Sequence, residues 1–152
     1  MKLKKILSEK EKNHGVCSVR ANASIKEAAE KLVEHNVGCL LVTDPGNPEK
    51  YVGIVAQTDI IKKCAADDNF REVEVQEVMV KDMIVATGED EVDYIVKVMN
   101  RHKIHHIPVI EKGKIRGIIS ITDIIGSLYE EDEIKIHYLS DYMGGTYGSN
   151  VF

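Results

Sequence analysis

The feature that most constrains the fold of this chain is a nine-residue stretch that occurs twice. Residues 53–61 read GIVAQTDII and residues 117–125 read GIISITDII, so six of the nine positions are identical. In each copy a glycine opens an apolar run, and a Thr-Asp pair follows where a helix is expected to begin. Two copies of one local pattern predict two copies of one structural unit.

The flanking sequence repeats at a constant spacing. Ile25 and Val92 are 67 positions apart, whereas Asp59 and Asp123, which follow the hairpins, are 64 apart. The longer first turn, Asp44-Pro45-Gly46-Asn47-Pro48, accounts for the difference, because these residues preset or permit turn dihedrals. Each unit reads strand–helix–strand–strand–helix. Neither half of a 152-residue chain buries much alone, so we expect the halves to pack face to face.

Local signals place the elements. A capping box at Ser24 and Glu27 precedes a helix that ends near His35, and Asp90 is expected to cap the equivalent helix, with its apolar face at Val92, Ile95, Val96 and Met99. The expected strands are 16–19, 39–43, 51–56, 83–86, 106–110 and 114–120, with a tight turn at Lys112-Gly113 and one helical turn at 77–81.

The fold class is therefore α+β, with two βαββα repeats. The acidic, polar stretch 67–76 is the natural linker, which assigns residues 1–75 to the first repeat with an N-terminal segment and 76–129 to the second. That segment should hold a short helix from Leu3 to Leu7. Residues 130–152 form a tail in which Ile134, Tyr138 and Tyr142 share a helical face that could pack on the domain or cover a dimer partner.

Composition narrows the function. A net charge of −5 argues against nucleic acid or an anionic membrane as partner. No apolar run could span a bilayer, and the start of the chain lacks a signal-peptide core, so we expect a cytoplasmic protein. The scattered Cys17, Cys39 and Cys64 suggest neither disulfides nor a zinc knuckle, and the histidines at 102, 105 and 106 lack nearby ligands that would complete a metal site. No catalytic motif is present, so we expect no enzyme and no catalytic cofactor.

The repeated aspartates, Asp59 and Asp123, could simply offset the positive end of a helix dipole. Their repetition after a strand end points further. A helix N-terminus offers free N–H groups to an anion, and a carboxylate there can accept both hydroxyls of a ribose. The nearby hydroxyls of Thr58, Ser120 and Thr122 can donate to phosphate or ribose oxygens. This pattern predicts a nucleotide with its sugar on the aspartate and its phosphate on the N–H groups.

The repeat, ending in glycine, two apolar residues, Ser/Thr, any residue, Ser/Thr, Asp and Ile, resembles the CBS domain, named from cystathionine beta-synthase. Two tandem copies resemble a Bateman module, over roughly residues 1–129. The second copy matches best, with residues 105–109 (HHIPV) followed by the turn at 117–125. The resemblance implies repeats packed about a pseudo-twofold axis, leaving two clefts that bind adenine nucleotides or adenosyl compounds.

The resemblance also implies roles for residues. In the first pocket Asp59 and Thr58 would bind ribose, His105 and His106 phosphate, and Ile54 and Ile84 the adenine. In the second, the ribose would meet Asp123, Thr122 and Ser120, with Thr122 also near phosphate, and the adenine Ile118, Cys17 and Val16.

The two copies depart from the family pattern in different places. Ala56 stands where the family prefers Ser or Thr, and Gly38-Cys39 stands where the second repeat has His105-His106. The Asp59 pocket is therefore expected to favour a phosphate-bearing nucleotide. The Asp123 pocket, which would lack the basic partners, should better tolerate an uncharged or cationic adenosyl group.

The expected function is a regulatory, energy-sensing module. It would bind AMP or ATP, or else ADP, NAD or S-adenosylmethionine, and transmit the bound state to a partner enzyme or transporter. The resemblance suggests a homodimer. The alternative is a dimerising interaction protein without a ligand, which controls a partner enzyme or transporter.

Overall fold

The computed structural model describes residues 1–11, 16–129 and 138–143, and it contains two three-stranded sheets. The first repeat comprises β1 (Ser18–Arg20), α2 (Ile25–His35), β2 (Cys39–Asp44), β3 (Asn47–Ala56) and α3 (Gln57–Ala66). The second comprises β4 (Ala86–Thr87), α4 (Val92–His102), β5 (His106–Glu111), β6 (Lys114–Ser120) and α5 (Ile121–Leu128). The predicted α+β fold with two βαββα repeats is confirmed.

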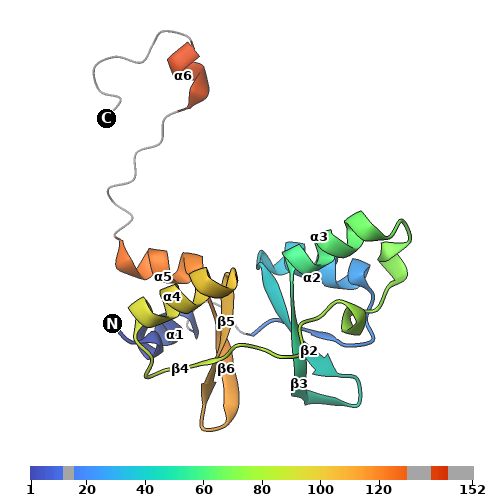
Figure 1. Ribbon diagram of the computed structural model, residues 1–152, viewed down its shortest axis with the longest axis horizontal. Coiled ribbons are helices and arrows are strands. Elements are labelled where there is room, and N and C mark those ends of the chain that lie inside the picture. The colour runs from blue at the N-terminus through green and yellow to red at the C-terminus, as the bar shows by residue number, and fades with distance from the viewer. Residues whose placement is uncertain (12–15, 130–137, 144–152) are drawn as a thin grey trace.

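The two sheets have the same topology. In each, the short first strand pairs in parallel with the second, which forms an antiparallel hairpin with the third. Figure 1 shows both hairpins, β2–β3 and β5–β6, projecting in one direction, with the helix pairs α2–α3 and α4–α5 at the opposite end of the repeats. The third strands, β3 and β6, each lie at an edge of their sheet.

Local chemistry explains where the elements begin and end. The Ser24 hydroxyl accepts a hydrogen bond from the Glu27 N–H at 3.2 Å, so the predicted cap of α2 is present. The hairpin turn at Lys112-Gly113 has positive φ at both residues, as a two-residue turn requires. The prediction that Asp90 caps α4 is wrong, because Glu91 holds the cap position. The Asp90 carboxylate instead accepts a hydrogen bond from the Thr87 N–H at 2.7 Å.

The segment before each repeat packs against the other repeat. Helix α1 (Leu3–Glu11) buries its apolar face in the core of the second repeat through Leu3, Ile6 and Leu7. Backbone hydrogen bonds fix this placement, since the Leu3 N–H donates to Asp90 O at 3.0 Å and the Val92 N–H to Met1 O at 2.9 Å.

The exchange is reciprocal. Two 3₁₀ turns, η1 (Phe70–Glu72) and η2 (Val75–Glu77), precede the second repeat, and the fully buried Val75 belongs to the first core. The Val75 N–H donates to Ala23 O at 2.8 Å. Chain order groups α1 with the first repeat, as expected from sequence, but its packing partner is the second. We call α1 and residues 70–80 the crossing segments, because each packs on the repeat that it does not immediately precede. Neither repeat has a complete core without its crossing segment.

Several bounds differ from those expected. The first strand of each sheet lies later than predicted, at 18–20 and 86–87, and the helical turn expected at 77–81 lies earlier, as η2 at 75–77. In the tail a short helix, α6 (Leu139–Met143), is described, whereas the predicted position of Ile134 lies outside the described residues. Among the helices of the described residues, none is both long and apolar enough to cross a membrane.

Candidate functional site

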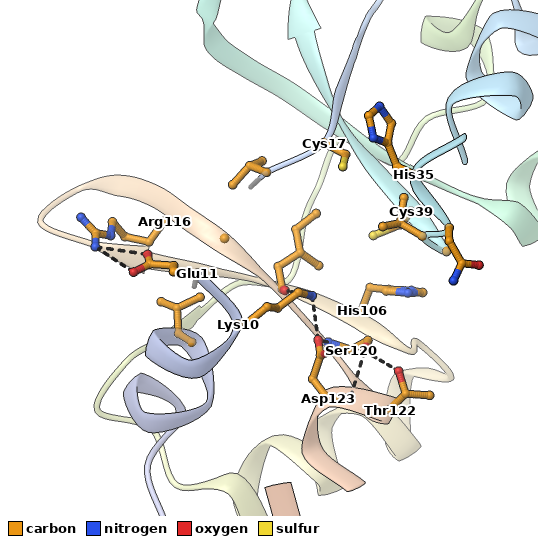
Figure 2. A pocket seen from close by; sticks show the side chains of 17 residues that line it. Lys10, Glu11, Cys17, His35, Cys39, His106, Arg116, Ser120, Thr122 and Asp123 are labelled. Atoms are coloured by element: carbon orange, nitrogen blue, oxygen red, sulfur yellow. Dashed lines mark hydrogen bonds and ion pairs between the residues drawn. The ribbon is translucent and has the colours of Figure 1, made fainter. Parts of the chain in front are cut away.

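A cavity of about 340 Å³ lies between the two repeats (Figure 2). Its walls come from α1, the segment before β1, the α2–β2 connection, β6 and the start of α5. The six residues predicted for the second pocket all line it: Val16, Cys17, Ile118, Ser120, Thr122 and Asp123. Both repeats therefore contribute to one site, although the sequence positions are about a hundred residues apart.

Asp123 is held at the floor of this cavity by the turn from β6 into α5. The Ser120 hydroxyl caps the helix by accepting the Asp123 N–H at 3.1 Å, and the Asp123 Oδ2 accepts the Ser120 N–H at 2.8 Å. The hydroxyls of Ser120 and Thr122 share a hydrogen bond at 2.7 Å. Within the described residues, the other carboxylate oxygen, Oδ1, accepts no hydrogen bond, which leaves an acceptor for a ligand hydroxyl.

Lys10 of α1 reaches into the same site (Figure 2). Its Nζ donates to Asp123 Oδ2 at 2.7 Å and to the Ile118 carbonyl oxygen at 2.6 Å. Burial alone would raise the pKa of Asp123, but hydrogen bonds from Lys10 and Ser120 outweigh it and hold the pKa below its usual value. The carboxylate is therefore charged at neutral pH.

Lys10 was not anticipated from sequence, because it lies in a run of charged residues, 9–12, that resembles a solvated helix end. One signal could have found it. Lys10 follows Leu3, Ile6 and Leu7 at helical spacing, so it lies on the buried face of α1. A lysine that ends an apolar helical face can extend its ammonium beyond that face.

His106 also lines the Asp123 cavity, whereas the sequence assigned it to the Asp59 pocket. The physical reason is strand register: His106 pairs with Ser120 between β5 and β6, and paired residues of neighbouring strands point to the same face. Burial and the neighbouring Lys10 hold the pKa of His106 below its usual value, so the imidazole is neutral at pH 7. His105 is exposed and is not part of the cavity wall.

The expectation that the Asp123 pocket lacks basic partners does not hold. Lys10, Arg116, His35 and His106 line it, opposed by Asp123 and Glu11. Arg116 is paired with Glu11 at 3.2 Å. On the first-repeat side of the cavity, burial raises the pKa of the Cys39 thiol to about 12, so this thiol is uncharged at neutral pH.

The Asp59 turn has a different surrounding. Asp59 accepts the Ala56 N–H at 2.8 Å, but Ala56 offers no hydroxyl to cap α3. Ile54 pairs with Val80 of the crossing segment, with backbone hydrogen bonds of 3.0 and 2.8 Å. Ile84, expected beside Ile54, packs against the core of the second repeat, and Thr58 is exposed.

Within the described residues, no group of three or more His, Cys, Asp or Glu side chains is arranged to hold a metal ion. The chemistry available at the site is that of carboxylates, hydroxyls, an ammonium, a guanidinium and imidazoles around a cavity that apolar side chains also line.

Comparison with known proteins places this geometry in a family. The CBS domain model matches residues 12–66 and 75–130. The chain is 33% identical to an uncharacterized 17.7 kDa protein of Acidianus ambivalens over 84% of this chain and 76% of that relative, and it spans as little as 20% of longer relatives.

Solved structures that are similar to this chain include ligand complexes. A CBS domain protein of Pyrobaculum aerophilum complexed with AMP is 25% identical, with a TM-score of 0.72 over 83% of this chain and 92% of that one. The CBS domain pair of protein MJ0100, in complex with 5′-methylthioadenosine and S-adenosyl-L-methionine, is 26% identical, with a TM-score of 0.68 over 97% and 98%. The chain belongs to the CBS-domain family and carries two CBS domains in tandem.

Proposed function

We propose that this protein is a regulatory module that binds an adenosyl ligand, foremost an adenine nucleotide, in the Asp123 cavity. One observation carries the proposal: a charged carboxylate, with one oxygen to which no described residue donates, faces a cavity shared by both repeats. A ribose presents two adjacent hydroxyl donors, which suit a carboxylate acceptor. The hydroxyls of Ser120 and Thr122 lie beside it.

The size of the cavity limits the ligand. A volume of about 340 Å³ falls at the low end of the range of about 300–1,000 Å³ that is typical of small-molecule sites. This favours one nucleoside or mononucleotide, such as AMP, over a dinucleotide such as NAD. The ligands of the two related structures all contain one adenosine, which supports the same class.

The role of binding is regulatory rather than catalytic. The cavity walls come from both repeats and from α1, so a ligand that contacts all of them favours one arrangement of these parts. A partner enzyme or transporter that distinguishes the two arrangements would read the ligand concentration.

The outer helices offer a surface for assembly. Ile61 on α3 and Ile125 on α5 occupy equivalent positions of the two repeats, and they are 62% and 50% exposed. Apolar side chains repeated at equivalent exposed positions suit a two-fold contact between copies, since each copy presents the same patch. A homodimer is therefore part of the proposal.

Isothermal titration calorimetry with AMP, ATP and adenosine tests the binding role. Asp123→Ala should weaken AMP at least about tenfold, because charged hydrogen bonds contribute about 1.5–3 kcal/mol. Asp93→Ala is the matched control, since it removes an exposed acid from the first turn of α4. Absence of binding by the wild-type protein would leave the ligand-free interaction protein as the better account.

A further inference from the structure

We propose that Lys10 determines which adenosyl ligands the Asp123 cavity accepts: it selects ligands that carry a phosphate over neutral or cationic ones. The inference rests on the proposed function of this cavity and adds a specificity determinant from α1.

The position of Lys10 is fixed by folding. Three buried apolar residues anchor α1 in the second core, and Lys10 follows on the same helical face. Its side chain is 27% exposed, and its ammonium makes two short hydrogen bonds, to Asp123 and to the Ile118 carbonyl. An ion pair at this burial is less screened than one on the open surface.

The ligand and Lys10 compete for one carboxylate. No described residue donates to Asp123 Oδ1, but Oδ2 already accepts from Lys10 and from the Ser120 N–H. A ribose that binds through both hydroxyls takes Oδ2 as well as Oδ1, so it displaces the ammonium from Oδ2. The flexible lysine stem lets the ammonium leave Oδ2 while it stays hydrogen-bonded to the Ile118 carbonyl inside the cavity.

The displaced ammonium then needs an anion. Among the described residues, Glu11 is the second acid that lines the cavity, and it is already paired with Arg116 at 3.2 Å. Glu9 on the same helix accepts a hydrogen bond from the Ser127 hydroxyl. A phosphate on the ligand supplies the missing partner. A neutral adenosyl group leaves the ammonium without one, and a sulfonium adds a second positive charge.

The charge count of the wall leads to the same result. Among the described residues of the wall, two cations, Lys10 and Arg116, balance two anions, Asp123 and Glu11, beside the imidazoles of His35 and His106. Without Lys10 the wall is negative by one charge, which favours a cationic ligand. Ile54 is the equivalent of Ile118 in the first repeat, and its carbonyl accepts the Val80 backbone N–H rather than a lysine ammonium. Lys10 is therefore a feature by which the Asp123 site differs from the Asp59 site.

Calorimetry with AMP, adenosine and S-adenosylmethionine tests the inference on Lys10→Met and Lys10→Gln. The glutamine variant keeps a donor for the Ile118 carbonyl and removes only the charge, so it also serves if the methionine variant does not fold. Lys5→Met is the matched control, because Lys5 lies on the same helix, is exposed and is not part of the cavity wall.

In the wild-type protein and in Lys5→Met, AMP should bind at least about tenfold more tightly than adenosine, as expected for one charged hydrogen-bonded pair. In the Lys10 variants this ratio should fall towards one, and S-adenosylmethionine should bind more tightly than in the wild type. An AMP-to-adenosine ratio that is unchanged in both Lys10 variants, with AMP binding still lost in Asp123→Ala, overturns the inference and leaves the proposed function intact. AMP binding that survives in Asp123→Ala overturns both.

Discussion

The two glycines that open the repeated turns, Gly53 and Gly117, offer a matched pair of substitutions. Each lies in an edge strand that a crossing segment approaches closely: residues 79–80 at Gly53 and α1 at Gly117. A Cβ on Gly53 would lie 2.9 Å from the Val80 carbonyl oxygen and 2.8 Å from the Met79 sulfur. A Cβ on Gly117 would lie 2.8 Å from the tip of the Leu7 side chain.

The expected costs differ because a backbone atom cannot move as a side-chain tip can. Forcing extra volume into a packed site costs about 1–3 kcal/mol. At Gly53 the same shift strains the two hydrogen bonds between Ile54 and Val80, each worth about 0.5–1.5 kcal/mol. Replacing glycine by alanine also stabilises the folded state by about 0.4–1 kcal/mol, because it lowers the conformational entropy of the unfolded chain. Gly53→Ala should therefore lose about 2–4 kcal/mol of unfolding free energy, and Gly117→Ala should stay within about 1 kcal/mol of the wild type.

Urea unfolding followed by circular dichroism measures both variants against the wild type, with equal m values required for the comparison. A difference of about 2 kcal/mol corresponds to roughly 4–8 °C in Tm for a chain of this size. Equal losses, or a larger loss for Gly117→Ala, would refute the close approach of Val80 to β3.

Three further predictions follow from the described contacts. Ile6→Ala should cost about 2–5 kcal/mol in urea unfolding, because Ile6 is 2% exposed in the second core; a cost below about 0.5 kcal/mol, as for a surface site, would contradict the crossed packing. The folded pKa of Asp123 lies below 3.8, so its stabilisation is complete above that pH and lost as pH falls through the folded value. Acid unfolding of Asp123→Asn should lack this component, and an unchanged acid profile would count against the Lys10 ion pair. Cys39, buried and with its pKa raised to about 12, should react with iodoacetamide far more slowly than the exposed Cys64; comparable labelling rates by mass spectrometry would show that the cavity wall opens.

The sequence predicted what local chemistry determines. The cap at Ser24, the turn at Lys112-Gly113 and the hydroxyl set around Asp123 depend on residues a few positions apart, and the structure contains each of them. The twofold repeat was visible because equivalent positions keep their chemistry at a constant spacing.

What the sequence did not predict depends on long-range placement. Nothing near Leu3 or Val75 indicates that each segment completes the opposite core. The register that pairs His106 with Ser120 directs the imidazole to the Asp123 side, and a one-residue change of register would have reversed it. Lys10 reaches Asp123 only because α1 crosses over, so its role follows from tertiary packing.

The central claim is that the Asp123 cavity binds an adenosyl ligand through its ribose. A crystal structure of the wild-type protein grown with AMP tests it most directly. The account predicts electron density for AMP between the repeats, with the ribose hydroxyls on the Asp123 carboxylate and the phosphate within reach of Lys10. AMP bound elsewhere, or an empty cavity in which Lys10 remains on Asp123 at saturating AMP, would contradict it.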